Sequence, residues 1–140
     1  MSGVEGLSTL FLDASFLVAL FGAGDTMHQR AVELLRAADS AECRLCTIWD
    51  CLSEALTVLR RHFGYRAACA LADSVQDLTL VTYDTSHRLE AVARFRRRTR
   101  RRPLSVVDVL CSVVVERELA GAPALSFDRD LRALGLTVIS

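Results

Sequence analysis

Two short apolar runs in this chain share one design: each is rich in strand-forming residues, ends at an aspartate and is followed by a helix-like segment. Residues 9–12 lead into Asp13, and residues 123–127 lead into Asp128. In open α/β sheets, ligands collect outside the carboxyl ends of the strands. The two runs therefore predict an α/β fold in which both aspartates lie at one edge of the sheet.

The rest of the chain alternates between strand-like and helix-like segments. Strands separated by helices predict a mainly parallel central sheet, here in a three-layer α/β/α sandwich. The length of 140 residues and the hydrophobic content of 51% suit one domain, residues 1–140. The expected strands are 9–13, 44–48, 78–82, 123–127 and 136–139, and the expected helices are 15–22, 27–38, 49–62, 65–75, 85–98, 105–119 and 129–134.

Two further acids, Asp108 and Glu54, fall in expected helices. Asp108 lies near the start of a helix so apolar that it must be mostly buried, where an unpaired carboxylate would be costly. Each acid also has a purely structural explanation. Asp13 and Asp128 suit helix N-caps, and Ser105 with Asp108 resembles a capping box. Glu54 points away from the buried stripe of its helix, so periodicity alone makes it a surface residue.

Arginine supplies all 17 basic residues of a chain whose formal net charge is zero. Seven arginines fall within nine residues and lead into the helix that bears Asp108. A cationic surface beside these acids suits a substrate with a phosphate backbone, because phosphates dominate nucleic-acid affinity. The alternative is a solvated helix end and loop. The run comprises Arg94, Arg96, Arg97, Arg98, Arg100, Arg101 and Arg102.

The cysteines and the absence of sorting signals predict a cytoplasmic protein. The chain starts without a secretory signal, and no apolar stretch reaches the roughly 18 residues of a membrane span. Five cysteines in such a context are expected to be reduced thiols. Cys43 and Cys46 have CxxC spacing, but no second pair or histidine follows at the spacing of a zinc site.

Four motifs, in order along nearly the full chain, resemble those of the PIN domain, in particular the VapC toxin group. Phe-Leu-Asp-Ala-Ser at 11–15 is similar to the opening strand of the family, and Ser-Glu-Ala-Leu-Thr at 53–57 to its glutamate-bearing helix. Leu-Ser-Val-Val-Asp at 104–108 resembles its Leu-Ser-x-x-Asp helix start. Residues 125–131 resemble its Thr-x-Asp-x-Asp-Phe segment, with serine for threonine and leucine for phenylalanine.

The resemblance implies a metal-dependent endoribonuclease, usually a homodimer, inhibited by a cognate VapB antitoxin that inserts a segment into or near the active site. Clustered carboxylates repel one another unless a cation compensates, and Mg²⁺ or Mn²⁺ suits an all-oxygen site. Such an ion would supply an activated water for phosphodiester hydrolysis. Products with 5′-phosphate and 3′-hydroxyl ends are expected.

Roles for individual residues follow from the resemblance and from the chemistry of their oxygen atoms. Glu54 is expected to be a catalytic metal ligand or a base that positions the water. Asp130 either ligates through a water or stabilises the short helix that follows Asp128. The expected metal ligands, also catalytic, are Asp13, Asp108 and Asp128. The residues expected to orient these carboxylates are Ser15, Ser105 and Ser126.

Three other interpretations compete with a toxin. A receiver-like phosphoacceptor domain also clusters acids at strand ends, but it needs a lysine on a late strand and this chain has none. A PIN fold that has lost catalysis could serve as a binding module, although the presence of all four acids argues against it. An RNA-processing PIN nuclease without an antitoxin is hardly separated from a toxin by sequence.

Overall fold

A computed structural model describes residues 3–98 and 101–140 of the chain. Within these residues, five parallel strands form one sheet in the order β3-β2-β1-β4-β5. The strands are β1 (Thr9–Leu12), β2 (Arg44–Thr47), β3 (Thr79–Leu80), β4 (Ala124–Leu125) and β5 (Val138–Ile139). The helices are α1 (Ala14–Phe21), α2 (His28–Ser40), α3 (Trp49–His62), α4 (Tyr65–Ser74), α5 (Thr85–Arg98) and α6 (Val106–Glu118), with short 3-10 turns η1 (Val75–Asp77) and η2 (Arg129–Leu134).

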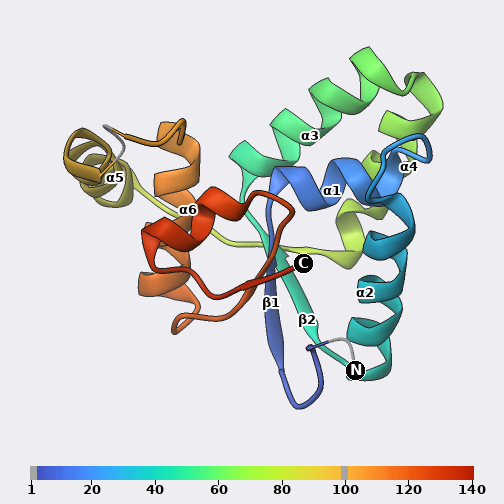
Figure 1. Cartoon of the computed structure of the whole chain (residues 1–140), viewed down its shortest axis with the longest axis horizontal. Helices are drawn as coiled ribbons and strands as arrows, with labels where there is room; N and C mark the ends of the chain where they lie inside the picture. Colours follow the sequence, from blue (N-terminus) through green and yellow to red (C-terminus); the bar gives the residue numbers. More distant parts are fainter. Residues whose placement is uncertain (1–2, 99–100) are drawn as a thin grey trace.

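Helices cover both faces of the sheet. Figure 1 shows α1, α2, α3 and α4 on one side, and α5 and α6 on the other. Alternate residues of β1 face the two layers, because side chains of a strand point to opposite faces. Leu10 and Leu12 pack in the core with α1 to α4, while Phe11 packs in the core with α5 and α6. The predicted α/β/α sandwich with a parallel sheet is confirmed.

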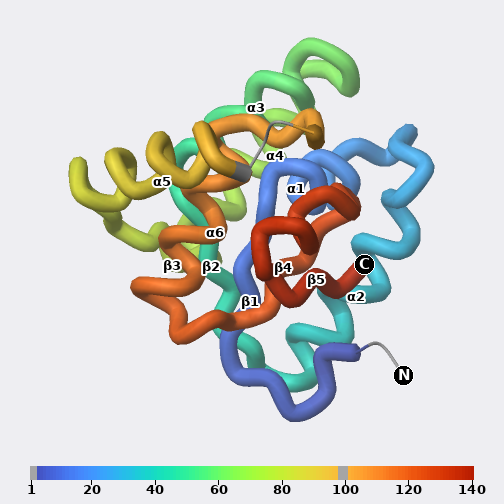
Figure 2. Tube along the Cα trace, turned by 60° about the vertical axis from the view of Figure 1, so that its left-hand side comes forward, coloured from blue at the N-terminus to red at the C-terminus, as the bar shows by residue number. Residues whose placement is uncertain are grey.

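The middle of the sheet brings two distant parts of the chain together. β1 pairs with β4 so that Leu12 lies opposite Leu125, and the next residues, Asp13 and Ser126, leave the sheet side by side. From β1 the chain passes through α1 and α2 to β2, whereas it reaches β4 from α6 on the other face. The tube in Figure 2 follows these two routes. The junction of β1 and β4 is thus a topological switch point, where α/β sheets commonly bind ligands.

Three strands are shorter than the sequence predicts, since β3, β4 and β5 keep only two residues each. Flanking residues still bond to the neighbouring strand: the Val81 amide donates to the Thr47 carbonyl, and the Ser126 amide to the Ile139 carbonyl. The apolar helix α6 is buried from Val109 to Val115, as its composition predicts. Among the described residues, no helix is long and apolar enough to cross a membrane.

Candidate active site at the end of the central strands

Asp13 is the most enclosed of the acids, with 6% of its surface exposed. It caps α1, because its Oδ1 accepts the Phe16 amide at 3.0 Å. The same Oδ1 accepts the Ser15 hydroxyl at 2.8 Å, and Oδ2 accepts the Ser126 hydroxyl at 2.6 Å. Three donors therefore fix the carboxylate at the end of β1, which makes Asp13 both a helix cap and a rigidly oriented acid.

The two serines tie Asp13 to the loop that follows β4. Ser15 Oγ accepts the Phe127 amide at 3.0 Å, and Ser126 Oγ accepts the Asp128 amide at 3.0 Å. Each hydroxyl thus gives its proton to Asp13 and uses a lone pair to hold a backbone N–H. This geometry agrees with the orienting role expected for both serines.

Burial raises the pKa of Asp13 from 3.8 to about 6. Hydrogen bonds from Ser126, the Phe16 amide and Ser15 favour the charged form and oppose this shift, while the nearby Asp108 adds to it. Desolvation outweighs the three hydrogen bonds. An acid with this pKa is one for which a bound cation would be strongly favourable.

Asp108 is held by the capping box that the sequence predicts. Ser105 Oγ accepts the Asp108 amide at 3.1 Å, and Asp108 Oδ2 accepts the Ser105 amide at 2.9 Å. Its pKa is raised, first by partial burial and then by the charges of Asp128 and Asp130. The capping role and proximity to the other acids therefore coexist in one side chain.

Glu54 is exposed on α3, as periodicity predicts. By surface area the residue is exposed, yet enough protein surrounds its carboxyl to raise its pKa, with Asp108 as the second cause. The carboxylate of Glu54 therefore lies within electrostatic reach of Asp108. Although Glu54 is exposed, it is close enough to Asp108 to be a member of the acidic cluster.

Asp128 and Asp130 occupy the turn after β4. Asp128 caps η2, its Oδ1 accepting the Asp130 amide at 3.0 Å. The Asp130 carboxylate accepts the Arg102 guanidinium at 3.1 Å. Arg102 of the basic run therefore forms an ion pair with Asp130. The sequence did not decide whether Asp130 binds metal or only stabilises the turn.

Two hollows flank Glu54. One, of about 400 Å³, lies toward α1 and the β4 loop and is lined by Ser15, Met27 and Phe127 among others. The other, of about 420 Å³, lies toward the starts of α3 and α6. Its lining residues are Trp49, Asp50, Ser53, Glu54, Thr57, Val58, Ser105 and Val107. A larger hollow of about 670 Å³ between α3 and α4 contains none of the clustered acids, so its size does not make it the site.

The side chains at this edge of the sheet offer oxygen ligands, which hard divalent cations such as Mg²⁺ and Mn²⁺ prefer. Carboxylates and hydroxyls converge on one edge of the sheet. Burial first, and repulsion from a neighbouring acid second, raise the pKa values of Asp13, Asp108 and Glu54, and a bound cation would offset both effects. In the described part of the chain, no three acidic, histidine or cysteine side chains already surround a common point as metal ligands. Binding an ion would therefore draw carboxylates of the cluster together.

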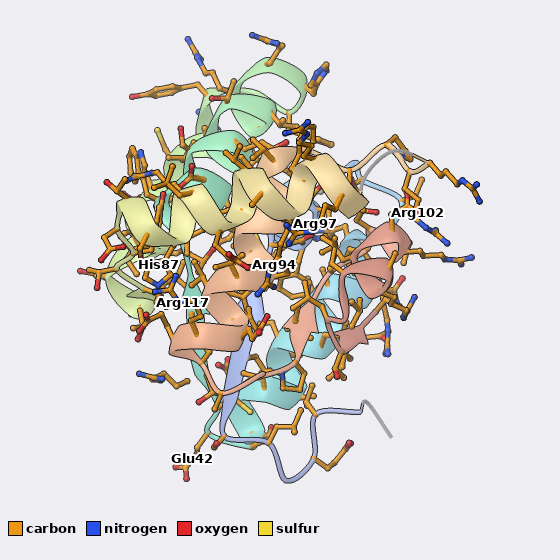
Figure 3. All side chains as sticks on the ribbon, turned by 90° about the vertical axis from the view of Figure 1, so that its left-hand side faces the viewer. Glu42, His87, Arg94, Arg97, Arg102 and Arg117 are labelled. Carbon is orange, nitrogen blue, oxygen red and sulfur yellow. The ribbon has the colours of Figure 1, made fainter. Side chains whose placement is uncertain are left out.

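The basic run does not behave as one surface. Arg94 is only 12% exposed in its side chain, since it bridges Glu90 at 2.8 Å and Glu116 at 2.6 Å between α5 and α6 (Figure 3). This differs from the expectation that Arg94 contacts RNA, because its guanidinium is already bound by the carboxylates of Glu90 and Glu116. The exposed members are Arg96, Arg97, Arg101 and Arg102. Arg100 and the side chain of Arg98 lie outside the described residues.

Sequence reasoning missed two groups beside the acids. Asp50 stands four residues before Glu54 on α3, and its Oδ1 is buried without a hydrogen-bond partner among the described residues. The i, i+4 spacing of two acids was the available signal. Cys51 and Cys111, both free thiols, meet at 3.3 Å between α3 and α6. Their contact raises the pKa of Cys111, with burial as the second cause.

Known proteins share this architecture and sequence pattern. Residues 10–136 match the PIN domain family. Two curated relatives from Mycobacterium tuberculosis strains, both named 23S rRNA-specific endonuclease VapC20, are 31% identical over 131 residues, covering 93% of this chain and 97% of the relative.

Solved structures agree. The crystal structure of M. tuberculosis VapC20, described as a Sarcin-Ricin loop cleaving toxin, has a TM-score of 0.78 at 29% identity, covering 91% of this chain and 96% of that one. PAE2754 from Pyrobaculum aerophilum, with a TM-score of 0.61 and 18% identity over 94% of this chain and 91% of that one, shares the fold. This chain is therefore a member of the PIN domain family and belongs to the VapC group within it.

Proposed function

We propose that this chain is an endoribonuclease that depends on Mg²⁺ or Mn²⁺ and acts as the toxin of a type II VapBC toxin–antitoxin pair. The observation that carries the proposal is the Asp13 network. A buried carboxylate, fixed by two serines and a helix amide, keeps a pKa of about 6 beside Asp108. Full-length similarity to an endonuclease of the VapC group supports the same conclusion.

Asp13, Asp108 and Asp128 would hold the cation, with Glu54 as a further ligand or as the group that positions water. When bound, a divalent ion lowers the pKa of a water and offsets charge that develops on phosphate oxygens. Ser15 and Ser126 keep the Asp13 carboxylate facing the cluster, and Ser105 does the same for Asp108. Because these contacts exist before substrate arrives, little reorganisation is needed during the reaction.

Glu54 lies between the two hollows, where a strand of RNA crossing the site would pass. Its exposed carboxylate, with a raised pKa, is suited to accept a proton from the attacking water. The exposed arginines of the run, Arg96, Arg97, Arg101 and Arg102, together with Arg98 and Arg100, are proposed to contact RNA phosphates. Arg94 is left out of this set because its ion pairs hold α5 against α6.

The substrate class is structured RNA, and 23S ribosomal RNA is the first to test, since that is what the names of the relatives specify. A homodimer and a VapB-type antitoxin are the proposed partners. Co-expression with a VapB-type antitoxin should yield a stable complex in which RNA cleavage is suppressed. Size exclusion of the chain alone should give the mass of a dimer.

The decisive experiment incubates purified protein with total RNA and with 23S rRNA, with Mg²⁺, with EDTA, and with EDTA followed by excess Mg²⁺. Cleavage should stop with chelator and return with the ion, leaving 5′-phosphate and 3′-hydroxyl ends. Asp13→Asn and Asp108→Asn should each abolish it, whereas Asp73→Asn, an exposed acid on α4, serves as the matched control. Cleavage that persists in EDTA or in both cluster variants would contradict the metal mechanism.

A further inference from the structure

Trp49, the only tryptophan of the chain, opens α3 with 60% of its surface exposed. An exposed aromatic ring can bury a large apolar area against the flat face of a ligand. The helix begins near the start of α1 and projects from the sheet (Figure 1), and Trp49 is its first residue. It lines the same hollow as Glu54 and Ser105.

The Trp49 ring differs from those of Tyr65 and Tyr83, each of which has an arginine over its ring. Arg60 lies 5.0 Å from the centre of the Tyr65 ring, and Arg88 lies 4.8 Å from that of Tyr83. Among the described residues, no arginine or aromatic ring stacks on Trp49. The indole is therefore available to stack on a ligand.

The chemistry of the hollow narrows the choice of ligand. Its charged wall consists of Asp50 and Glu54, so a phosphate group would be repelled, while a neutral ring would not. The Ser53 hydroxyl and the Glu54 carboxylate offer acceptors. A ligand with a flat apolar face and N–H donors at its edge would use both the indole and these acceptors.

We propose that this hollow is a subsite for one unpaired nucleobase of the RNA substrate, which stacks on Trp49 beside Glu54. The inference rests on the proposed ribonuclease function and adds how the substrate is held. Aromatic stacking is a common way for proteins to bind unpaired bases, because every base presents a π face. Trp49 is thus a positioning residue that places the adjacent phosphodiester at the acids.

A single tryptophan makes the contact directly observable. In an Asp108→Asn background that cannot cleave, titration with a short single-stranded RNA should quench the fluorescence of Trp49, as stacked bases do to an indole. An abasic oligonucleotide of the same length has the same backbone charge without bases. It should leave the emission almost unchanged, which separates stacking from phosphate binding.

Variants in the same background give the size of the effect. Trp49→Ala should weaken binding of labelled RNA, measured by anisotropy, by roughly 5- to 150-fold, the range of one lost base stack. Trp49→Phe should restore most of the affinity because it keeps a stacking ring. Tyr65→Ala is the matched control: Tyr65 is 65% exposed but follows the far end of α3, about 20 Å along a helix of 14 residues.

Three results would overturn the subsite. RNA binding with unchanged Trp49 emission would place the base elsewhere. Equal quenching by the abasic oligonucleotide would assign the signal to backbone binding. An emission maximum that shifts with protein concentration, without response to RNA, would assign Trp49 to contact between two copies of the chain. Wild-type cleavage in Mg²⁺ is assayed in parallel, so that persistent cleavage without quenching refutes only the subsite, and quenching without cleavage refutes only the nuclease.

Discussion

Replacing Asp13 by asparagine should stabilise the protein at neutral pH and lose that benefit in acid. The carboxylate is 6% exposed, and burial raises its pKa from 3.8 to about 6. Between these two values the folded state binds more protons than the unfolded state, so stability falls as pH rises. The penalty is absent below about pH 4 and complete above about pH 6.

The size of the effect follows from the shift. A rise of about two pKa units corresponds to about 3 kcal/mol of destabilisation at neutral pH. An amide removes this penalty and can still accept the Phe16 amide and the Ser15 hydroxyl. The amide NH₂ of the asparagine takes the place of Oδ2. The Ser126 hydroxyl then has to accept a hydrogen bond where it donated one before, which costs about 1 kcal/mol. The net gain expected for Asp13→Asn is therefore about 2 kcal/mol at about pH 7.5.

Urea unfolding with EDTA present, at about pH 7.5 and about pH 4, measures both sides of this prediction. The variant should unfold at higher urea at the first pH and show no advantage at the second, because Asp13 is then protonated in the folded wild type. Asp73→Asn, an exposed acid on α4, should change stability by less than about 0.5 kcal/mol. A difference between Asp13→Asn and wild type that is the same at both pH values would refute desolvation as the cause.

Further expectations concern the ion, Glu54 and the arginines. Mg²⁺ should raise the thermal midpoint of wild type but not of Asp13→Asn, since an ion bound only by the folded state stabilises it; an equal rise in both would mean that ions bind elsewhere. Glu54→Gln should lose most RNA cleavage while unfolding at equal or higher urea, because repulsion among the acids is relieved; wild-type turnover would return Glu54 to a solvated surface. The double variant Arg97→Gln, Arg101→Gln should lower the log–log slope of RNA affinity against salt concentration by roughly 0.7 per lost phosphate contact. Arg94→Gln should leave RNA affinity unchanged. It should instead lower the free energy of unfolding in urea by about 1 to 2 kcal/mol, because its ion pairs join α5 to α6.

Local sequence patterns were sufficient to predict the architecture and the strand-end acids. Each expected strand and helix has a counterpart, since alternation of apolar runs and helical periodicity is a local property. The capping explanations for Asp13, Asp108 and Asp128 were correct, and they do not compete with a site. A cap fixes a carboxylate at the first turn of a helix, and three such turns begin at the same sheet edge.

What the sequence could not supply depends on contacts between distant segments. Arg94 looked like one member of a solvated run because Glu116, which removes it from solvent, is 22 residues away on α6. Glu54 was expected to be a surface residue without a role because helical periodicity predicts only which residues are buried in the core. It does not predict that the charge of Asp108 lies nearby. The hollow beside Trp49 was missed for a related reason, because it is enclosed only when Ser105 and Val107 at the start of α6 pack near the start of α3.

The paired roles of Ser15 and Ser126 limit how this protein can vary in evolution. Each hydroxyl is a donor to Asp13 and an acceptor for a backbone amide of the β4 loop, so loss of either oxygen breaks two bonds at once. Alanine or cysteine would leave a partly buried amide without a good acceptor, whereas threonine preserves both bonds and adds only a methyl group. Among functional relatives, drift at these two positions should thus be confined to exchange between serine and threonine, even where the surrounding loop diverges.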